Sequence, residues 1–300
     1  MPSSIKSGLI TKQKLTEEEL LAIQQLVEVC NAHEGLHMRV PYALFETQSG
    51  PEFDNFLFYR DDQLVGCLIL GSWEMEKKEQ VLGAVHPDYR RQGIFRTLFE
   101  TASRECVDLG VKWLVLESER ASSAGKATAL ALGARYDSSE HVMELGEFQE
   151  RYTFDPGLYF QEADAGDVEA LVAIQSKSFA MPEERARRSV TYFLRNPRSR
   201  FYLATFGERR LGCREPVGML RVNETDEAVG IYVFAILPDY RGHGFGRQML
   251  EETIRTIRAR TQKPIRLDVD VNNAAALALY RSCGLQVIAT CDYYIADLRS

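Results

Sequence analysis

The sequence predicts a mixed α/β protein in which one domain occurs twice. Three observations support this prediction: the length, a recurring ten-residue stretch, and the same order of strand-like and helix-like segments around each copy. The stretch reads PDYRRQGIFR at 87–96 and PDYRGHGFGR at 238–247. The chain has 300 residues, which is more than one ordinary hydrophobic core uses and suits two domains of about 150 residues each.

The two copies are separated by a constant spacing of 151 residues, from Arg90 to Arg241. The same spacing carries residue 133 onto residue 284, both glycines, without a gap. A constant spacing over such a length indicates a duplicated domain, and the period is far too long for a solenoid. We therefore expect domains at 1–150 and 151–300, divided near the Pro- and Gly-containing stretch ERYTFDPG.

Each half is predicted to open with a strand-like piece and an amphipathic helix. In the first half this helix covers 16–32, with Thr16 as N-cap and Glu19 as its capping-box partner. In the second half the corresponding helix follows Asp164 or Asp167, either of which suits an N-cap.

Strands rich in apolar and β-branched residues come next. They are predicted at 55–60, 64–70 and 79–85 in the first half, and at 201–206, 216–222 and 229–236 in the second. The third strand of each half runs into the recurring stretch, which leads directly into a helix. A further strand, a short Ala-rich helix and a last strand complete each half.

A strand, a glycine-rich loop and a helix together form an arrangement that binds phosphate, because backbone N–H groups and the helix N-terminus face the anion. Two well-known versions are excluded here. A P-loop requires Lys and then Ser or Thr after its last Gly, but Gly246 is followed by Arg247 and Gln248. A dinucleotide fingerprint that starts at Gly242 would require Gly at position 247.

The remaining pattern, R-x-x-G-x-G at 241–246, resembles the pyrophosphate loop of the GNAT superfamily of acyl-CoA-dependent N-acyltransferases. A second stretch, 269–287, resembles the next motif of that superfamily. The matching positions are Asn273, Ala276, Leu279, Tyr280 and Gly284. The resemblance covers the second half, extends more loosely to the first, and implies two tandem GNAT-like domains.

The resemblance also implies direct transfer of an acetyl group from acetyl-CoA to a primary amine. Tyr280 matches the general acid that protonates the departing thiolate, and a phenol is protonated at neutral pH. Backbone groups of the strand before the loop would align the pantetheine arm, and N–H groups of the loop would hold the pyrophosphate. The implied cofactor-binding residues are Ala235, Ile236, Arg241, Gly242, His243, Gly244, Phe245, Gly246, Arg247 and Asn273.

The residues at the usual positions of the general base depart from the superfamily pattern. The strand positions at which many members carry Glu hold Gly230 and Tyr232 here. Asp268 and Asp270 alternate on one face of the next strand and suit either a base or an attractor of a cationic amine. A water relay explains the pattern equally well, so the alternatives stay open.

The first half has lost several of these residues. At the constant spacing, Tyr280 corresponds to Ala129, Asn273 to Ser122, and Gly246 to Phe95. We therefore interpret the first half as a degenerate copy that shapes the substrate site or stabilises the second half. Binding of CoA without turnover stays open, and Glu79 is either a base or an exposed residue at a strand entry.

Two other functions compete with an enzyme of this kind. One is a non-catalytic acyl-CoA-binding or sensor protein on the duplicated fold. The other is a zinc hydrolase that uses HEGLH at 33–37, although Gly35 would cost about 1 kcal/mol inside the helix that such a site requires. The Arg-rich stretch 185–200 is either a solvated helix face or a basic rim over the second-half site.

Composition excludes further classes. The net charge of −7 argues against general nucleic-acid binding, and no apolar run approaches the length of a membrane span. The first residues lack the apolar core of a signal peptide, so we expect a cytoplasmic protein. The six cysteines show no CxxC spacing and are expected to be free thiols. A small-molecule amine is the expected partner; neither its identity nor the oligomeric state follows from the sequence.

Overall fold

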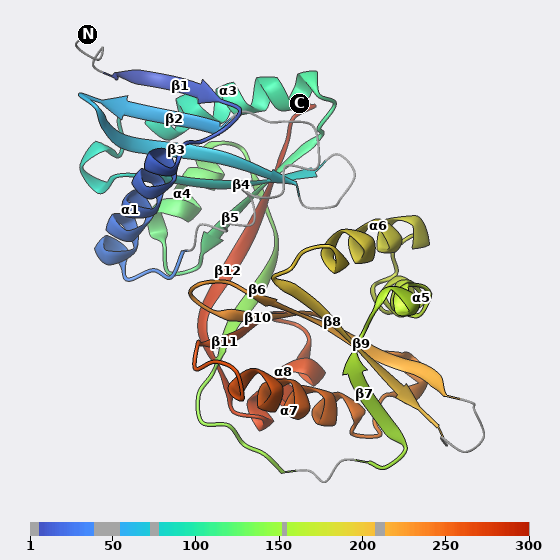
Figure 1. Cartoon of the computed structure of the whole chain (residues 1–300). Coiled ribbons are helices and arrows are strands. Elements are labelled where there is room, and N and C mark those ends of the chain that lie inside the picture. Colours follow the sequence, from blue (N-terminus) through green and yellow to red (C-terminus); the bar gives the residue numbers. More distant parts are fainter. Residues whose placement is uncertain (1–5, 39–54, 73–77, 152–154, 208–213, 300) are drawn as a thin grey trace. The chain divides into compact units, whose positions relative to one another are not determined.

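The computed structural model describes residues 6–38, 55–72, 78–151, 155–207 and 214–299 (Figure 1). The chain divides into two compact units. Unit 1 comprises Met1–Ser139 and Ala289–Ser300, and unit 2 comprises Glu140–Ile288. Each unit has a mixed sheet with helices on its faces, which confirms the predicted α/β fold class.

The sheet of unit 1 is antiparallel except between its fourth and fifth strands, which are parallel. In sheet order its strands are β1 (Gly8–Lys12), β2 (Asn55–Arg60), β3 (Gln63–Ser72), β4 (Lys78–Val85), β5 (Trp113–Glu119) and β12 (Leu285–Asp297). Its helices are α1 (Glu17–Glu34), α3 (Ile94–Asp108) and α4 (Ser123–Ala131). One apolar cluster joins α1 to the sheet, and another joins α3 and α4 to it.

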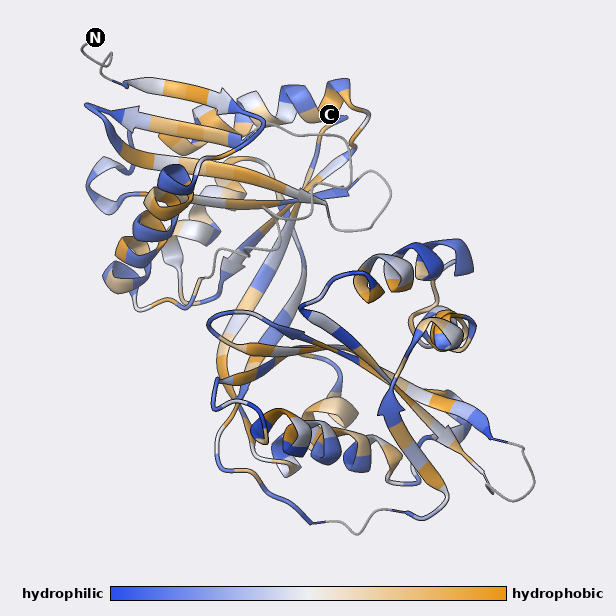
Figure 2. Cartoon of the chain, in the orientation of Figure 1, coloured by the Kyte–Doolittle hydropathy of each residue, from blue (hydrophilic) through white to orange (hydrophobic). Residues whose placement is uncertain are grey.

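Within the residues that the structure describes, unit 2 repeats this plan with one additional helix. In sheet order its strands are β6 (Arg135–Leu145), β11 (Ile265–Asp270), β10 (Val229–Ile236), β9 (Glu215–Glu224), β8 (Ser199–Phe206) and β7 (Leu158–Glu162). Its helices are α5 (Val168–Phe179), α6 (Glu183–Leu194), α7 (Phe245–Arg258) and α8 (Ala274–Ser282). Apolar side chains of α5 and α6 form one core with the sheet, and those of α7 and α8 form another. Figure 2 shows the apolar residues concentrated on the strands and on one side of the helices.

Each unit takes a strand from the other half of the sequence. Residues 291–297 of β12 pair with β5 in unit 1, and residues 140–144 of β6 pair with β11 in unit 2. The compact units therefore differ at their edges from the expected halves, 1–150 and 151–300. The cause is that the last strand of each repeat pairs outside its own half of the sequence.

Local predictions agree with these elements. Thr16 accepts a hydrogen bond from the N–H of Glu19, and the reciprocal bond completes the predicted capping box. Asp164 caps the short turn that precedes α5. No described helix has the length and apolar character needed to cross a membrane. The described cysteines are free, as expected, and Cys213 lies outside the described residues.

Candidate active site

The strand that enters the glycine loop of unit 2 carries a β-bulge. Between Tyr232 and Ala235, β10 shifts register against β9, and Val233 has a φ of 48°. A β-branched residue at positive φ is strained, and such strain persists only where the surrounding structure imposes it. Bulges redirect peptide groups and are frequent beside functional sites. No sequence pattern indicated this bulge, because Val favours regular strands.

The parallel pairing between β10 and β11 ends just before the bulge. Residues 229–231 pair with 265–267, whereas β10 continues to Ile236 and β11 to Asp270 without further pairs between them. We call the point at which this pairing ends the fork of unit 2. Beyond it, the backbone groups of Ala235 and Ile236 do not bond to β11. A strand that aligns a ligand must have backbone groups that are not used by a neighbouring strand, and these two residues meet that condition with respect to β11.

The loop beyond β10 presents backbone N–H groups. Gly242 and Gly244 both have a φ of 81°, a region in which only Gly is unstrained, and Gly244 is the N-cap of α7. In the described part of the chain, the N–H groups of residues 242–246 meet no backbone or side-chain acceptor. Together with the positive end of α7, they fit an anion such as a pyrophosphate. A Cβ at Gly242 would meet nothing within 4 Å, so the space beside the loop is open.

The side chains of the loop differ in their availability to a ligand. Arg241 is exposed and donates from Nε to the carbonyl of Ile236 at 3.0 Å, with no carboxylate partner among the described residues. His243 contacts the carbonyl of Arg241 through Nδ1 at 3.0 Å. Phe245 is buried against Phe206, so it offers only its backbone to a ligand.

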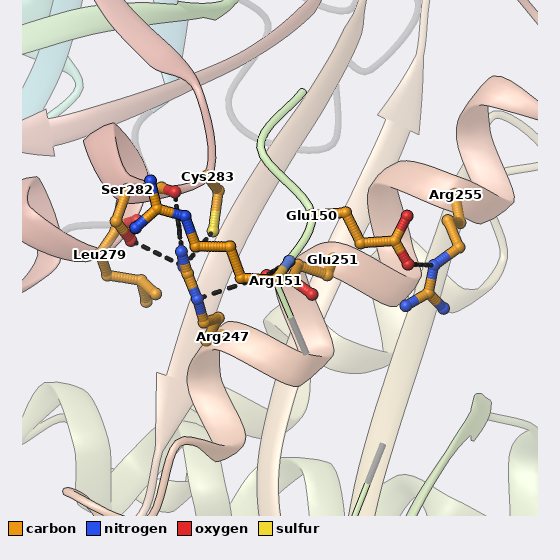
Figure 3. Close-up of polar contacts among 8 residues, drawn as sticks. All are labelled: Glu150, Arg151, Arg247, Glu251, Arg255, Leu279, Ser282 and Cys283. Atoms are coloured by element: carbon orange, nitrogen blue, oxygen red, sulfur yellow. Dashed lines mark hydrogen bonds and ion pairs between the residues drawn. The ribbon is translucent and has the colours of Figure 1, made fainter. Parts of the chain in front are cut away.

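Arg247 differs from the role that the resemblance implied. Its guanidinium donates to the carbonyl of Ser282 at 2.7 Å and lies 3.3 Å from the carboxylate of Glu251, which is fully buried (Figure 3). Only 9% of Arg247 is exposed. The side chain therefore ties α7 to the end of α8 rather than facing the loop, because the i,i+4 spacing sets Arg247 above Glu251 on the inner face of the helix.

Tyr280 lies against the strand that leads to the loop. Its ring stacks on Phe234 with centroids 6.2 Å apart, and 8% of the residue is exposed. Burial raises the pKa of Tyr280 to about 12, so the phenol keeps its proton at neutral pH. Asn273 caps α8 by accepting from the N–H of Ala276 at 3.1 Å, which makes it a positioning residue for the helix that carries Tyr280.

The loop, the strand and α8 meet at Gly246. A Cβ there would lie 3.4 Å from Leu279, 3.7 Å from Ile236 and 3.9 Å from Phe234. The predicted cofactor-binding segment and the predicted acid thus belong to one cluster of elements. Phe234, which no sequence motif singled out, links them; its signal was a large aromatic residue two positions before the strand end.

The structure shows what lies at the positions considered for a general base. The ring of Tyr232 lies over Gly230, whose Cβ would meet its hydroxyl oxygen at 2.5 Å, so a phenol fills the place of an acidic side chain. Asp268 and Asp270 are exposed on β11. Arginines of the 185–200 stretch pair with surface carboxylates, for example Arg200 with Glu162 at 3.2 Å, as on a solvated face.

The stretch HEGLH does not form a metal centre. Helix α1 ends at Glu34, and Gly35 adopts a φ of 66°, so the two histidines do not share one helix face. His37 instead bonds Glu119, through its N–H at 2.6 Å and through Nδ1 at 3.2 Å. No group of three potential ligands capable of holding a metal occurs among the described residues.

Comparison with known proteins assigns the chain to a family. The sequence profile of the "Acetyltransferase (GNAT) family" matches residues 20–129 and again residues 168–285. Because these two matches cover most of the chain, the protein belongs to the acetyltransferase (GNAT) family. It is a tandem member of that family and an N-acetyltransferase, which confirms the resemblance carried by the loop and by Tyr280.

Individual relatives match different shares of the chain. A mycothiol acetyltransferase of Thermobispora bispora is 25% identical over 287 residues, covering 89% of this chain and 92% of its own. The [ribosomal protein bS18]-alanine N-acetyltransferase of Escherichia coli is 42% identical over 59 residues, 20% of this chain and 39% of its own. A GCN5-related N-acetyltransferase from Sphaerobacter thermophilus has the same fold, with a TM-score of 0.78 and 18% identity over 99% of this chain and 98% of that one. A tandem GNAT protein from the clavulanic acid pathway gives a TM-score of 0.70 at 16% identity over 97% and 98% of the two chains.

Proposed function

We propose that the protein transfers an acetyl group from acetyl-CoA to a primary amine, and that the chemistry takes place in unit 2. The observation that carries this proposal is the contact between Tyr280 and Phe234, because it sets a protonated phenol beside the strand that enters the phosphate-binding loop. In unit 1 the position of the phenol holds Ala129, which has no proton to donate.

The residues of unit 2 suit two parts of acetyl-CoA, the pyrophosphate and the pantetheine arm. The N–H groups of 242–246 and the exposed guanidinium of Arg241 suit the pyrophosphate, since charge-assisted bonds to phosphate are the strong ones. The backbone of Ala235 and Ile236, beyond the fork, suits the amide-bearing pantetheine arm. When bound, the cofactor supplies the thioester whose carbonyl carbon the neutral acceptor amine attacks.

The chain itself contributes positioning and proton transfer. The bulge at Val233 turns the strand backbone where the reacting group lies, and holding the reactants in place lowers the entropic part of the barrier. As the C–S bond breaks, Tyr280 donates its phenolic proton to the leaving sulfur. The proton lost by the amine passes to water or to a carboxylate near the fork, for which Asp268 and Asp270 on β11 are the candidates.

A small-molecule acceptor is the second part of the proposal. It is supported by the extent of the match, because the mycothiol acetyltransferase relative aligns over both halves, whereas the ribosomal-protein acetyltransferase aligns only over a short segment. Small amines are therefore the first acceptors to test.

The test is release of free thiol from acetyl-CoA in the presence of an amine library. We expect turnover with at least one small amine, and at least a tenfold loss in Gly244→Glu, which brings a carboxylate to the anion site. Because residue 244 adopts positive φ, thermal melting must show that the variant is folded. Tight binding of acetyl-CoA with no thiol release across the library would support the non-catalytic alternative instead.

A further inference from the structure

Unit 1 keeps the backbone of the phosphate loop. Arg90 has φ −68° and ψ 160°, and its counterpart Arg241 has −73° and 156°. Gly93 has the same φ of 81° as Gly244, and Arg91 adopts a φ of 62° where unit 2 has Gly242. Loop conformation alone would therefore predict a second anion site, and the neighbouring side chains decide whether it is open.

A carboxylate of unit 1 bridges the segments that follow β4 and β5, beyond the fork of unit 1, which is the point at which these two strands stop pairing. These strands pair in parallel over residues 78–81 and 113–116, and the pairing then ends, as in unit 2. Arg90 donates from Nε to the carbonyl of Val85 at the end of β4, at 3.1 Å, and from Nη1 to Glu34. The other oxygen of Glu34 accepts from Ser122, the N-cap of α4, at 2.9 Å. Glu34 thus bridges the loop and the start of α4.

The length of α1 brings Glu34 there. Helix α1 has 18 residues and its counterpart α5 has 12, which makes α1 longer by about 9 Å at 1.5 Å per residue. His37, just beyond α1, holds Glu119 at the end of β5. In unit 2 the chain turns into α6 after α5 ends, and no described side chain joins Arg241 to Asn273.

An aromatic ring fills a second part of the same region. Phe95, in the first turn of α3, lies on Gly83 of β4; a Cβ at Gly83 would meet the ring at 2.4 Å. At the constant spacing, unit 2 has the reverse pair, with the ring on the strand as Phe234 and the glycine in the helix as Gly246. In both units a ring therefore lies between the strand and the start of the helix, but it projects from the first turn of the helix in unit 1 and from the strand in unit 2.

The arginine of the loop in unit 1 is already paired with a carboxylate. Glu34 raises the pKa of Arg90 against the opposing effect of burial, as expected for a close ion pair. The side chains of Arg90 and Glu34 are 25% and 15% exposed, so the pair is only partly screened by solvent. A phosphate entering this fork would meet a carboxylate already bonded to the arginine that would otherwise bind it.

We infer that the chain binds one acyl-CoA, in unit 2, and that Glu34 and Phe95 fill the corresponding site of unit 1. The HEGLH stretch then has a structural role, because Glu34 and His37 fasten the end of α1 to both sides of the fork. This inference rests on the proposed function for the binding in unit 2, and its test separates the two.

The experiment is calorimetric titration of the full chain with acetyl-CoA. Matched variants place one carboxylate at equivalent loop positions, Arg91→Glu in unit 1 and Gly242→Glu in unit 2. We expect one site per chain in the wild type, one site of unchanged affinity in Arg91→Glu, and at least tenfold weaker binding in Gly242→Glu. Unchanged melting temperatures show that the variants are folded, and Arg91, with a φ of 62°, demonstrates that a side chain is tolerated at positive φ at this position of the loop.

Two sites in the wild type, one of them surviving in Gly242→Glu, would overturn the inference while leaving the proposed site in unit 2 intact. No binding by the wild type would overturn both the inference and the proposed site.

The double variant Glu34→Ala, Phe95→Gly tests whether these two side chains are what closes unit 1. It is expected to gain a second site that the further change Arg91→Glu weakens; a folded double variant that still binds only one equivalent would show that these two side chains are not what closes unit 1.

Discussion

Tyr280 stacks on Phe234 with ring centroids 6.2 Å apart, and no described residue accepts a hydrogen bond from its hydroxyl. The ring is fixed by packing while the hydroxyl is left for a ligand. Removing only the hydroxyl should therefore change chemistry without changing the fold.

In Tyr280→Phe we expect kcat to fall about 100-fold, the lower range for loss of a general acid, with little change in the KM for acetyl-CoA. Thiol release under saturating acceptor measures both constants. Since burial raises the pKa of Tyr280 to about 12, the wild-type rate should show no downward limb from this residue between pH 6 and 10. An equal loss in Phe234→Leu with Tyr280 intact would instead indicate that packing, not proton donation, limits the rate.

Arg247 and Glu251 form a buried ion pair, and breaking one side of it should destabilise unit 2. Glu251 is fully buried, so Arg247→Met leaves an uncompensated carboxylate. We expect a loss of about 3 kcal/mol in the free energy of unfolding, measured by denaturant titration. The double variant Arg247→Met, Glu251→Met removes both charges and should recover part of this loss; additive losses would show that the pair is not coupled.

Glu79 gives unit 1 an unusual dependence of stability on pH. Its side chain is buried, with Oε2 unpaired, and burial raises its pKa from 4.5 to about 8. The unfolded chain therefore releases this proton more readily than the folded one, so the contribution of Glu79 to stability is fully present below about pH 4.5 and is lost as pH rises to about 8. Cys106, the thiol nearby, has its own pKa raised to about 12 and stays neutral throughout.

Glu79→Gln keeps the shape of the side chain and removes the titration. We expect the variant to melt at a higher temperature than the wild type at pH 8, and the difference to shrink toward pH 5. Scanning calorimetry at several pH values measures this. A constant difference across the range would contradict the buried, neutral carboxyl.

The parts of the site that the sequence predicted are those written in local patterns. The glycines of the loop and the N-cap Asn273 act within a few residues of their partners, so their spacing alone suggests their places. Tyr280 was singled out by its place in a motif, whereas its contact with Phe234, which is distant in the sequence, was not predicted. Glu34 acts on Arg90 and Ser122, which are distant in the sequence, and only the folded chain brings them together. The bulge at Val233 contradicts the preference of its own residue type and was therefore not predicted.

In the fold, too, features set by local patterns were predicted and those set by distant contacts were not. Strand and helix order followed from periodicity, and the duplication from a constant spacing. The direction of the Arg247 side chain could not be predicted from the sequence. An arginine at a helix end can face a phosphate loop or the core, and the two cases look alike until the rotation of the helix is known. The pairing of β6 and β12 also depends on contacts between distant segments.

The exchanged strands make a prediction about fragments. A cut at 150 removes residues 140–145 of β6 from unit 2 and leaves β11 without its antiparallel partner. We therefore expect the fragment 151–288 to be poorly folded, whereas the fragment 140–288, which contains all of unit 2, should melt cooperatively. Circular dichroism during heating distinguishes the two outcomes. In the full chain, deletion of 289–300 should lower the stability of unit 1, because β5 loses the partner that pairs with residues 113–119. If 151–288 melts as sharply as 140–288, β6 contributes little and unit 2 is complete without the strand from the first half.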